Sequence, residues 1–158
     1  MHRLFHRRSD FSMVLRTALL AVLLLVAGAS LAQTEAVIES LSVQQLKTFM
    51  SAEGYAVHVD DDGDLIWKIE GFNAVMFVAD DQESLQFYAA FTSDSADLAK
   101  VNMWNRTKRY SRSYLDGDGD PCLELDLDLA GGVMPARIQD FIKTCRLSFE
   151  VWLTEVVR

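Results

Sequence analysis

Two runs of aspartate and glycine contain the residues best suited to binding a metal ion. They span residues 60–64 and 116–120, with the sequences DDDGD and DGDGD. Carboxylates at alternate positions of a tight turn begin a calcium loop, which then needs glycine at its sixth position and glutamate at its twelfth. The residues at those two positions are Leu65 and Gly71 in the first run, and Pro121 and Leu127 in the second. Both runs therefore favour β-hairpin turns, and we predict no metal site.

Side chains that commonly act as nucleophile or general base are scarce. His58 is the only histidine after residue 32, and the alternation of its strand places it on the polar side. The sequence has no HExxH, GxSxG, P-loop or dinucleotide-binding motif. Catalysis by a pair of carboxylates that only folding brings together stays open, because the sequence does not show such pairs. We expect a protein that is not an enzyme and uses no cofactor.

Cys122 and Cys145 are the only cysteines in the chain. In an oxidising compartment two cysteines can form a disulfide bond. Cys122 alternates with acidic residues along a strand, whereas Cys145 lies on the apolar side of a helix. The sequence leaves open both a disulfide bond and two separate thiols, because the distance between them decides.

A basic stretch without acidic residues lies between Asp97 and Asp116. Its cationic and aromatic residues are Lys100, Trp104, Arg106, Lys108, Arg109, Tyr110, Arg112 and Tyr114. Arginine and aromatic side chains are enriched at protein interfaces, so this stretch predicts a surface for an anionic partner segment. The alternative is internal, because a hairpin could pair it with the acidic strand that follows it, Glu124 to Asp128. The strand register of the hairpin decides between a partner surface and internal pairing, and the sequence leaves both open.

The first 32 residues have the pattern of a secretory signal peptide. Four arginines precede an apolar run of 16 residues, Thr17 to Ala32, which ends in small side chains. This run is shorter than the ~20 residues of a membrane-spanning helix, which favours cleavage before Gln33 over a retained anchor. We predict a periplasmic or secreted protein that contacts the membrane only through this segment before its cleavage. Residues 33–40 would be a tether and residues 41–158 a single domain.

The chain is acidic, with a formal net charge of −8 at pH 7. The first 32 residues contain four arginines and one aspartate, so the remainder carries −11. Because nucleic-acid binding needs a cationic surface, this charge argues against a nucleic-acid partner. We expect a protein partner, which could be a second copy of the chain.

The remaining pattern predicts an α+β domain. Ser42 and Gln45 form a capping box for a first helix, and Gly54 is a suitable stop. Four strand-like runs follow at residues 55–60, 65–71, 73–80 and 84–92, with the spacing of an antiparallel meander. A second helix begins near Ser95, a hairpin follows it, and Pro135 begins a last helix. The predicted order is α-β-β-β-β-α-β-β-α.

Two asparagines of the second helix, Asn102 and Asn105, share one side with its apolar residues. A buried amide needs hydrogen-bond partners, so they would tie this helix to a neighbouring strand or loop. The alternative is a polar ligand pocket beside them. On the last helix, Leu147 and Val151 lie opposite the apolar stripe. They are either scattered exposed residues or a contact with a partner or a second copy.

The stretch VNMWNRTKRYSRSYLDGDGDPCLELDLDLAGGV, residues 101–133, and the later pair Phe141 and Ile142 resemble the YbjN family of bacterial sensory transduction regulators. The resemblance is good over residues 95–157 and loose over 37–92. It implies a fold like the type III secretion chaperones, with a curved antiparallel sheet covered on one face by helices. No catalytic residue is carried over. The positions that match the family's characteristic run are Asn102, Trp104, Asn105, Leu115, Asp116, Gly119, Gly131 and Gly132.

Two functions follow as hypotheses. The first is an exported, non-enzymatic domain, chaperone-like or regulatory in the bacterial envelope, which binds a protein or dimerises. Its surface would be the open sheet face, the basic stretch or the side of Leu147 and Val151. The second is a sensor of a small ligand or of envelope stress, with a pocket near Asn102 and Asn105; Tyr114 and Asp116 belong to the same motif. The export signal distinguishes this chain from cytoplasmic members of the family and favours a periplasmic role.

Overall fold

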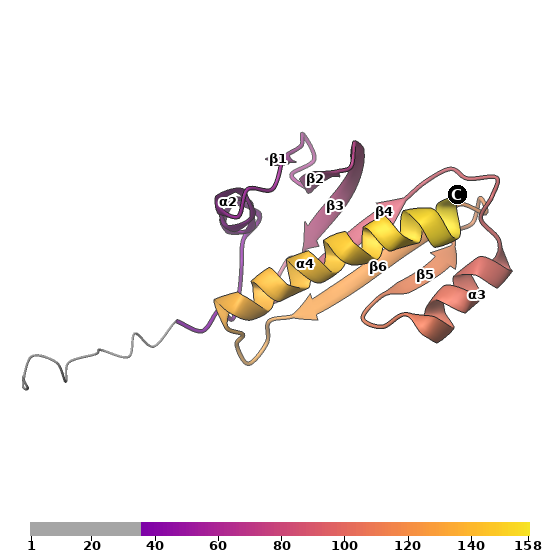
Figure 1. The fold of residues 1–158 in the computed structure, drawn as a ribbon. Coiled ribbons are helices and arrows are strands. Elements are labelled where there is room, and N and C mark those ends of the chain that lie inside the picture. The colour runs from indigo at the N-terminus through magenta and orange to yellow at the C-terminus, as the bar shows by residue number, and fades with distance from the viewer. Residues whose placement is uncertain (1–35) are drawn as a thin grey trace, which may run out of the picture. The chain divides into compact units, whose positions relative to one another are not determined.

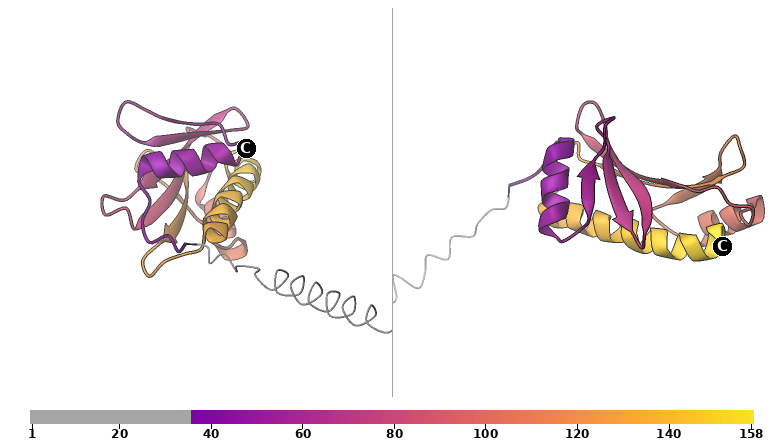
Figure 2. Two further views of the ribbon diagram at one scale, coloured as in Figure 1. Left: turned by 90° about the vertical axis from the view of Figure 1, so that its left-hand side faces the viewer. Right: turned by 90° about the horizontal axis from the view of Figure 1, so that it is seen from above.

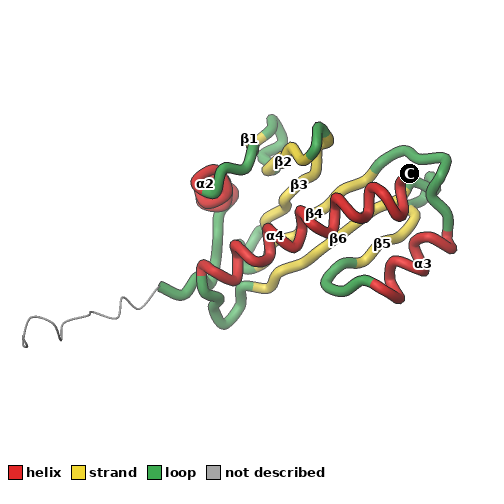
Figure 3. The backbone as a smooth tube through the Cα atoms, viewed as in Figure 1, coloured by secondary structure: helices red, strands yellow, loops and turns green. Residues whose placement is uncertain are grey.

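The computed structural model describes residues 36–158, which form an antiparallel sheet and the helices packed on it (Figures 1 and 3). In chain order the elements are α2 (Val43–Ala52), β1 (Val57–Val59), β2 (Leu65–Ile69), β3 (Phe72–Val78), β4 (Ser84–Ala90), α3 (Leu98–Thr107), β5 (Arg112–Leu115), β6 (Pro121–Asp128), α4 (Pro135–Trp152) and the π-helical turn η1 (Leu153–Val157). This order confirms the predicted α+β arrangement. The predicted signal peptide and the first residues of the predicted tether, 33–35, lie outside the described residues.

The six strands form one sheet in the order β1-β2-β3-β4-β6-β5. Strands β1 to β4 follow one another as an antiparallel meander, as their spacing predicts. The hairpin of β5 and β6 joins this meander with β6 beside β4, in a register that runs from Ser84↔Asp128 to Ala90↔Cys122. Strands β1 and β5 are therefore at the two edges of the sheet.

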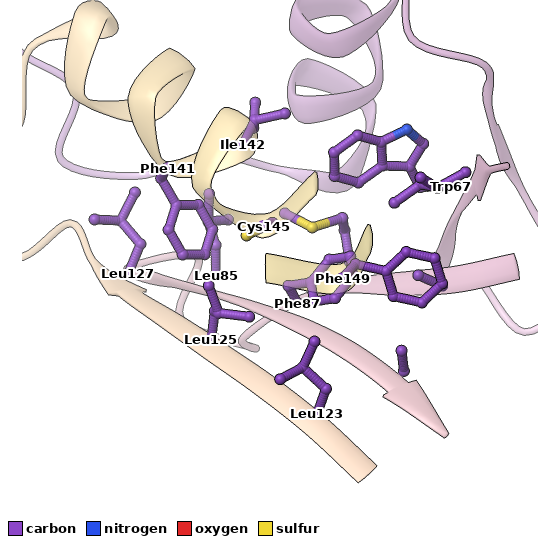
Figure 4. Close-up of a cluster of buried hydrophobic side chains, with 14 of the residues drawn as sticks. Trp67, Leu85, Phe87, Leu123, Leu125, Leu127, Phe141, Ile142, Cys145 and Phe149 are labelled. Carbon is purple, nitrogen blue, oxygen red and sulfur yellow. The ribbon is translucent and has the colours of Figure 1, made fainter. Parts of the chain in front are cut away.

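Helices α2 and α4 lie on one side of the curved sheet, which we call the covered face (Figure 2). Alternate leucines of β6 point to this side and meet apolar side chains of α4 (Figure 4). The buried residues of this layer include Leu123, Leu125, Leu127, Phe141, Ile142, Cys145 and Phe149. Burial of one large apolar side chain contributes roughly 1.5–3 kcal/mol, so this layer dominates the stability of the domain.

Local signals set both ends of the first helix and the start of the last helix. The backbone N–H of Ser42 donates to Oε1 of Gln45 at 2.8 Å, and the N–H of Gln45 donates back to Oγ of Ser42 at 3.3 Å, which is the predicted capping box. Gly54 follows α2 with φ of +86°, a conformation that glycine adopts without steric cost. Pro135 occupies the first turn of α4, as predicted. The apolar stripe that the sequence predicts for this last helix is buried throughout, at Ile138, Phe141, Ile142, Cys145, Phe149, Trp152, Leu153 and Val156.

Helix α3 begins later than predicted. Asp97 rather than Ser95 is its N-cap, because the Asp97 carboxylate accepts a hydrogen bond from the N–H of Lys100 at 2.8 Å. The backbone N–H of Ser95 instead donates to Oγ of Ser93, whose hydroxyl donates to the carbonyl of Val157 at 2.6 Å. The segment before α3 is thereby attached to the C-terminal turn of the chain.

Residues 36–40 of the predicted tether contact the domain. Ile38 and Val133 exchange two backbone hydrogen bonds, of 2.8 and 2.9 Å, which attach this segment to the turn before α4. Among residues 36–158, no helix combines the length and the apolar character needed to span a bilayer.

Candidate protein-binding surface

The second face of the sheet, which we call the outer face, has none of the helices of residues 36–158 packed on it (Figures 1 and 2). Its central side chains come from β3, β4, β6 and β5, because alternate residues of paired strands point the same way. They are Val75, Phe77, Gln86, Tyr88, Cys122, Glu124, Asp126, Arg112 and Tyr114. The rings of Phe77 and Tyr88 lie 6.0 Å apart, and Tyr114 near the sheet edge is 37% exposed. Three aromatic side chains therefore extend across a solvent-facing sheet.

Glu124 is the centre of a charged network on this face. Its side chain is nearly buried, accepts a hydrogen bond from the Tyr114 hydroxyl at 2.6 Å, and forms an ion pair with Arg112. The hydrogen bond to Glu124, reinforced by burial, raises the pKa of Tyr114 far above its ordinary value. The ion pair likewise raises the pKa of Arg112. Arg112 is thus neutralised within the hairpin, because β5 and β6 pair it with Glu124.

Tyr88 and Cys122 form the neighbouring contact on the outer face. The Tyr88 hydroxyl lies 3.5 Å from Sγ of Cys122, whose side chain is fully buried. This hydrogen bond, together with burial, raises the pKa of Tyr88 to about 12. Cys122 stands among polar residues in the sequence, but neighbouring side chains shield its thiol from solvent.

Cys122 and Cys145 are two separate thiols, so the disulfide alternative is wrong for this structure. Cys145 belongs to the apolar core on the covered face, whereas Cys122 points to the outer face, and the sheet lies between them. Burial in the core raises the pKa of Cys145 well above its ordinary value.

Trp104 is not the exposed anchor that the basic stretch suggested. Its side chain is 2% exposed, and its Nε1 donates to Oγ of Ser111 at 3.1 Å. Lys108 lies 5.3 Å from the centre of the Trp104 ring and 2.6 Å from Oε1 of Glu155. The ammonium of Lys108 is therefore engaged by an aromatic face and a carboxylate of the same domain.

Arg106 and Arg109 are the cations of the basic stretch that stay available. Both are exposed, and neither forms an ion pair with any other residue in the described part of the chain. Lys100 directs its Nζ to the carbonyl of Val156 at 3.5 Å. The structure thus divides the predicted basic surface into an internally bonded part and a smaller free part of two arginines.

Asn105 ties α3 to strand β5, whereas Asn102 does not. The Asn105 amide accepts a hydrogen bond from the N–H of Ser113 at 2.9 Å and donates to its carbonyl at 2.8 Å. Asn102, which like Asn105 is exposed, has no side-chain hydrogen bond to another described residue. The expected inward orientation is therefore wrong for Asn102, because the helix turns only its Val101 and Trp104 side toward the core.

Ser113 is a residue that the sequence analysis missed. It is 3% exposed, and its hydroxyl donates to the Cys122 carbonyl at 2.8 Å and accepts from Nε1 of Trp152 at 2.9 Å. Together with the Asn105 contacts, these bonds join α3, β5, β6 and α4 at one residue. A serine alternating with exposed arginine and tyrosine carries no signal of such a role.

The hollow beside Asn102 and Asn105 is shallow and open to solvent. Its volume is about 640 Å³, and its lining includes Leu98, Tyr114 and Leu115. The Asn105 amide is already occupied by Ser113, and Leu98 is 72% exposed. Asp116 is not in this lining; its carboxylate accepts hydrogen bonds from the N–H groups of its own turn. Ligand sites are usually enclosed, with several free polar groups converging, and this hollow is not of that kind.

Leu147 and Val151 lie on the solvent side of α4 and are 62% and 39% exposed. Helix α4 packs on the covered face (Figure 2), whereas Tyr88 and Tyr114 belong to the outer face. Leu147 and Val151 are therefore on the opposite side of the sheet from these tyrosines. Apart from the buried Trp104, the predicted partner-binding residues consequently belong to three surfaces: the outer face, the α3 end and the back of α4.

The aspartate runs form hairpin turns. Oδ1 of Asp60 accepts from the N–H groups of Asp62 and Asp64 at 3.1 and 2.9 Å, as Asx turns do. The second run has the same geometry at Asp116. In residues 36–158 no cluster of three or more histidine, cysteine or acidic side chains is arranged to hold a metal ion.

Fold and surface together define an α+β domain in which one face of an antiparallel sheet is buried under helices and the other faces solvent. The chain belongs to the YbjN family, whose model, described as "Putative bacterial sensory transduction regulator", matches residues 42–156. A regulatory role of this kind is in general non-enzymatic.

A solved structure supports the same fold. The structure "YbjN, a putative transcription regulator from E. coli" has a TM-score of 0.60 and 16% sequence identity, covering 72% of this chain and 88% of that chain. At this level of identity the likeness shows the fold alone. No curated protein matches the sequence.

Proposed function

We propose that this protein is an exported, non-enzymatic regulatory domain of the bacterial envelope, which binds another polypeptide through its outer face. The observation that carries the proposal is the row formed by Phe77, Tyr88 and Tyr114 on a sheet face that no described helix covers. Aromatic side chains are the residues most enriched at protein interfaces. The family description as a regulator supports a role in binding rather than in catalysis.

The polar groups of the outer face support this proposal. Glu124 is already paired with Arg112 and hydrogen-bonded to Tyr114, so a partner could cover it without burying an unpaired charge. The same bonds hold the Tyr114 and Arg112 side chains in place before any partner binds. Such preorganisation lowers the entropic cost of association.

Site-specific photo-crosslinking tests the surface. A photoreactive amino acid at position 77 should crosslink to a partner polypeptide in growing cells, whereas the same group at position 147 should not. The variant Phe77→Asp should weaken capture of that partner by at least about tenfold, because it places a charge in the aromatic row. The paired change Leu147→Ser and Val151→Ser is the matched control and should leave capture intact. Crosslinking at position 147 alone would move the binding surface to α4.

The location in the envelope has its own test. The protein recovered from cells should begin at Gln33 and fractionate with the periplasm or the medium. N-terminal mass spectrometry measures the first residue directly. An uncleaved N-terminus on a cytoplasmic protein would contradict the export part of the proposal and leave the binding part to be judged by crosslinking.

A further inference from the structure

We propose that the free edge of β6 at Asp126–Asp128 accepts an extended, basic segment of the partner as a seventh strand. This inference rests on the proposed function and specifies how and where the partner is held. The edge exists because β5 is shorter than β6: their pairing ends at Arg112↔Glu124, and β6 continues to Asp128. Tyr110, with φ of +66°, lies in the turn that leads from α3 into β5.

Alternation along β6 shows which backbone groups face this edge. The Leu129 N–H donates to the Glu83 carbonyl, and the Pro121 carbonyl accepts from Phe91, so the odd-numbered residues direct their backbone groups toward β4. In an antiparallel sheet, the even-numbered residues of β6 then direct their backbone N–H and C=O groups away from β4. Cys122 and Glu124 meet β5 there. The N–H and C=O groups of Asp126 and Asp128 face the same side, and no described strand pairs with them.

The outer edge of β5 is closed by contrast. The Asn105 amide occupies both the N–H and the C=O of Ser113, in the way a neighbouring strand would. Exposed edges are commonly protected in natural sheets, since they invite pairing with another chain. At this end of the sheet, β5 is protected and the end of β6 is not, so the end of β6 is the place for strand addition there.

Two hollows meet at the free edge and would receive the side chains of an added strand. Both are lined by Tyr110 and Asp126. One, of about 480 Å³, reaches Phe141 and Thr144 of α4, and the other, of about 320 Å³, reaches Glu124. Because side chains of a strand alternate between faces, one set would enter the first hollow and the other would lie on the outer face.

The charges at the edge select the occupant. Asp126 and Asp128 are exposed on the outer-face side of β6. Opposite charges on neighbouring strands stabilise a pair and like charges destabilise it. A second copy that paired through its own β6 edge would place aspartates against aspartates, whereas a segment with lysine or arginine at alternate positions would complement them.

A fluorescein-labelled peptide of alternating valine and lysine is a suitable probe, with fluorescence anisotropy as the readout on the purified protein. It should bind, and its counterpart with glutamate in place of lysine should bind at least about tenfold more weakly. A third peptide, with the same side chains but N-methylated at alternate residues, cannot form the strand ladder and should lose binding. No binding of the valine–lysine peptide at about 1 mM, or equal binding of the N-methylated peptide, overturns the proposal.

Hydrogen exchange measured by NMR locates the contact. The amides of Asp126 and Asp128 should exchange quickly in the free protein and become protected in the complex. Asp126→Pro removes one N–H from the free edge without removing a backbone bond to β4, although it also removes the side-chain acceptor of Gln86. It should weaken peptide binding by about tenfold. Asp126→Asn keeps that N–H and should weaken it less. If the partner crosslinks at position 77 while both amides stay unprotected, strand addition is wrong and the proposed function stands.

Discussion

The two faces of strand β6 are buried in different ways. On the covered face, Leu123 and Leu125 pack under α4, and dispersion and the hydrophobic effect hold them. On the outer face, Cys122 and Glu124 are 0% and 7% exposed, but they are shielded by the hydrogen-bonded side chains of Tyr88, Tyr114 and Arg112. Strand β6 thus contributes to one layer that helix α4 covers and to a second layer that is shielded only by its own hydrogen-bonded side chains.

This difference implies that the covered face determines stability, whereas the outer face is available for recognition of a partner. The covered face carries most of the buried apolar area, so changes there should affect the free energy of unfolding. The outer face keeps its side chains ordered while it remains accessible, so changes there should affect binding and the response to pH.

The largest effect is expected for Leu125→Ala. Leu125 is 1% exposed, and its truncation leaves a cavity under α4, which should lower the free energy of unfolding by about 2–5 kcal/mol. Urea unfolding followed by circular dichroism measures this change. The next residue is the matched control: Asp126→Ala, on the exposed outer face, should cost no more than about 0.5 kcal/mol. Equal costs for the two would show that the faces do not divide as we describe.

Ser113→Ala should lower the free energy of unfolding by about 1–3 kcal/mol, because it leaves the buried Nε1–H of Trp152 without its acceptor. The same unfolding experiment measures it. Ser111→Ala removes the equivalent acceptor of Trp104 at a half-buried position, where water can take its place. A smaller loss is expected there, and a larger one would contradict the central position of Ser113.

Tyr88 should make stability fall in alkaline solution. Its pKa is raised from an ordinary value of 10.0 to about 12 in the folded protein. Between these values the unfolded chain releases the tyrosine proton and the folded protein retains it, so the contribution is complete below pH 10 and is lost as the pH rises toward 12. Unfolding measured across this range should show the decline in the parent and a smaller decline in Tyr88→Phe. If stability declines with pH as much in Tyr88→Phe as in the parent, the contact between Tyr88 and Cys122 is not the cause of the decline.

The smallest effect on stability is expected at the α3 end. The double change Arg106→Glu and Arg109→Glu should alter the free energy of unfolding by no more than about 0.5 kcal/mol, because both side chains are exposed and unpaired within the described residues. Partner capture should fall if these arginines extend the binding surface. Arg112→Glu is the contrasting variant, since it would set two carboxylates against each other at Glu124 and cost more.

Features that depend on neighbouring residues along the chain could be predicted from the sequence. The capping box at Ser42, the stop at Gly54, the start of α4 at Pro135 and the apolar stripe of that helix all agree with the structure. The alternation of β6 correctly separated its leucines from its acidic residues. Each of these signals is a periodicity or a spacing within one element, which the backbone geometry imposes directly.

Features that depend on which elements meet could not be predicted in the same way. Asn102 and Asn105 are three residues apart on one helix, yet only Asn105 reaches Ser113. Trp104 and Cys122 occur among polar residues and are buried, because Ser111, Tyr88 and their neighbours surround them after folding.

The sequence by itself determined the order of helices and strands, both ends of the first helix, the start of the last helix, and which side of β6 faces the core. Only the tertiary structure decided that β6 lies beside β4 and that Arg112 is paired while Arg106 and Arg109 are free. It also decided that β6 extends beyond the residues that pair with β5. The physical reason is the range of the interactions: periodicity and capping act within a few residues, whereas strand order and ion pairs depend on contacts between distant parts of the chain.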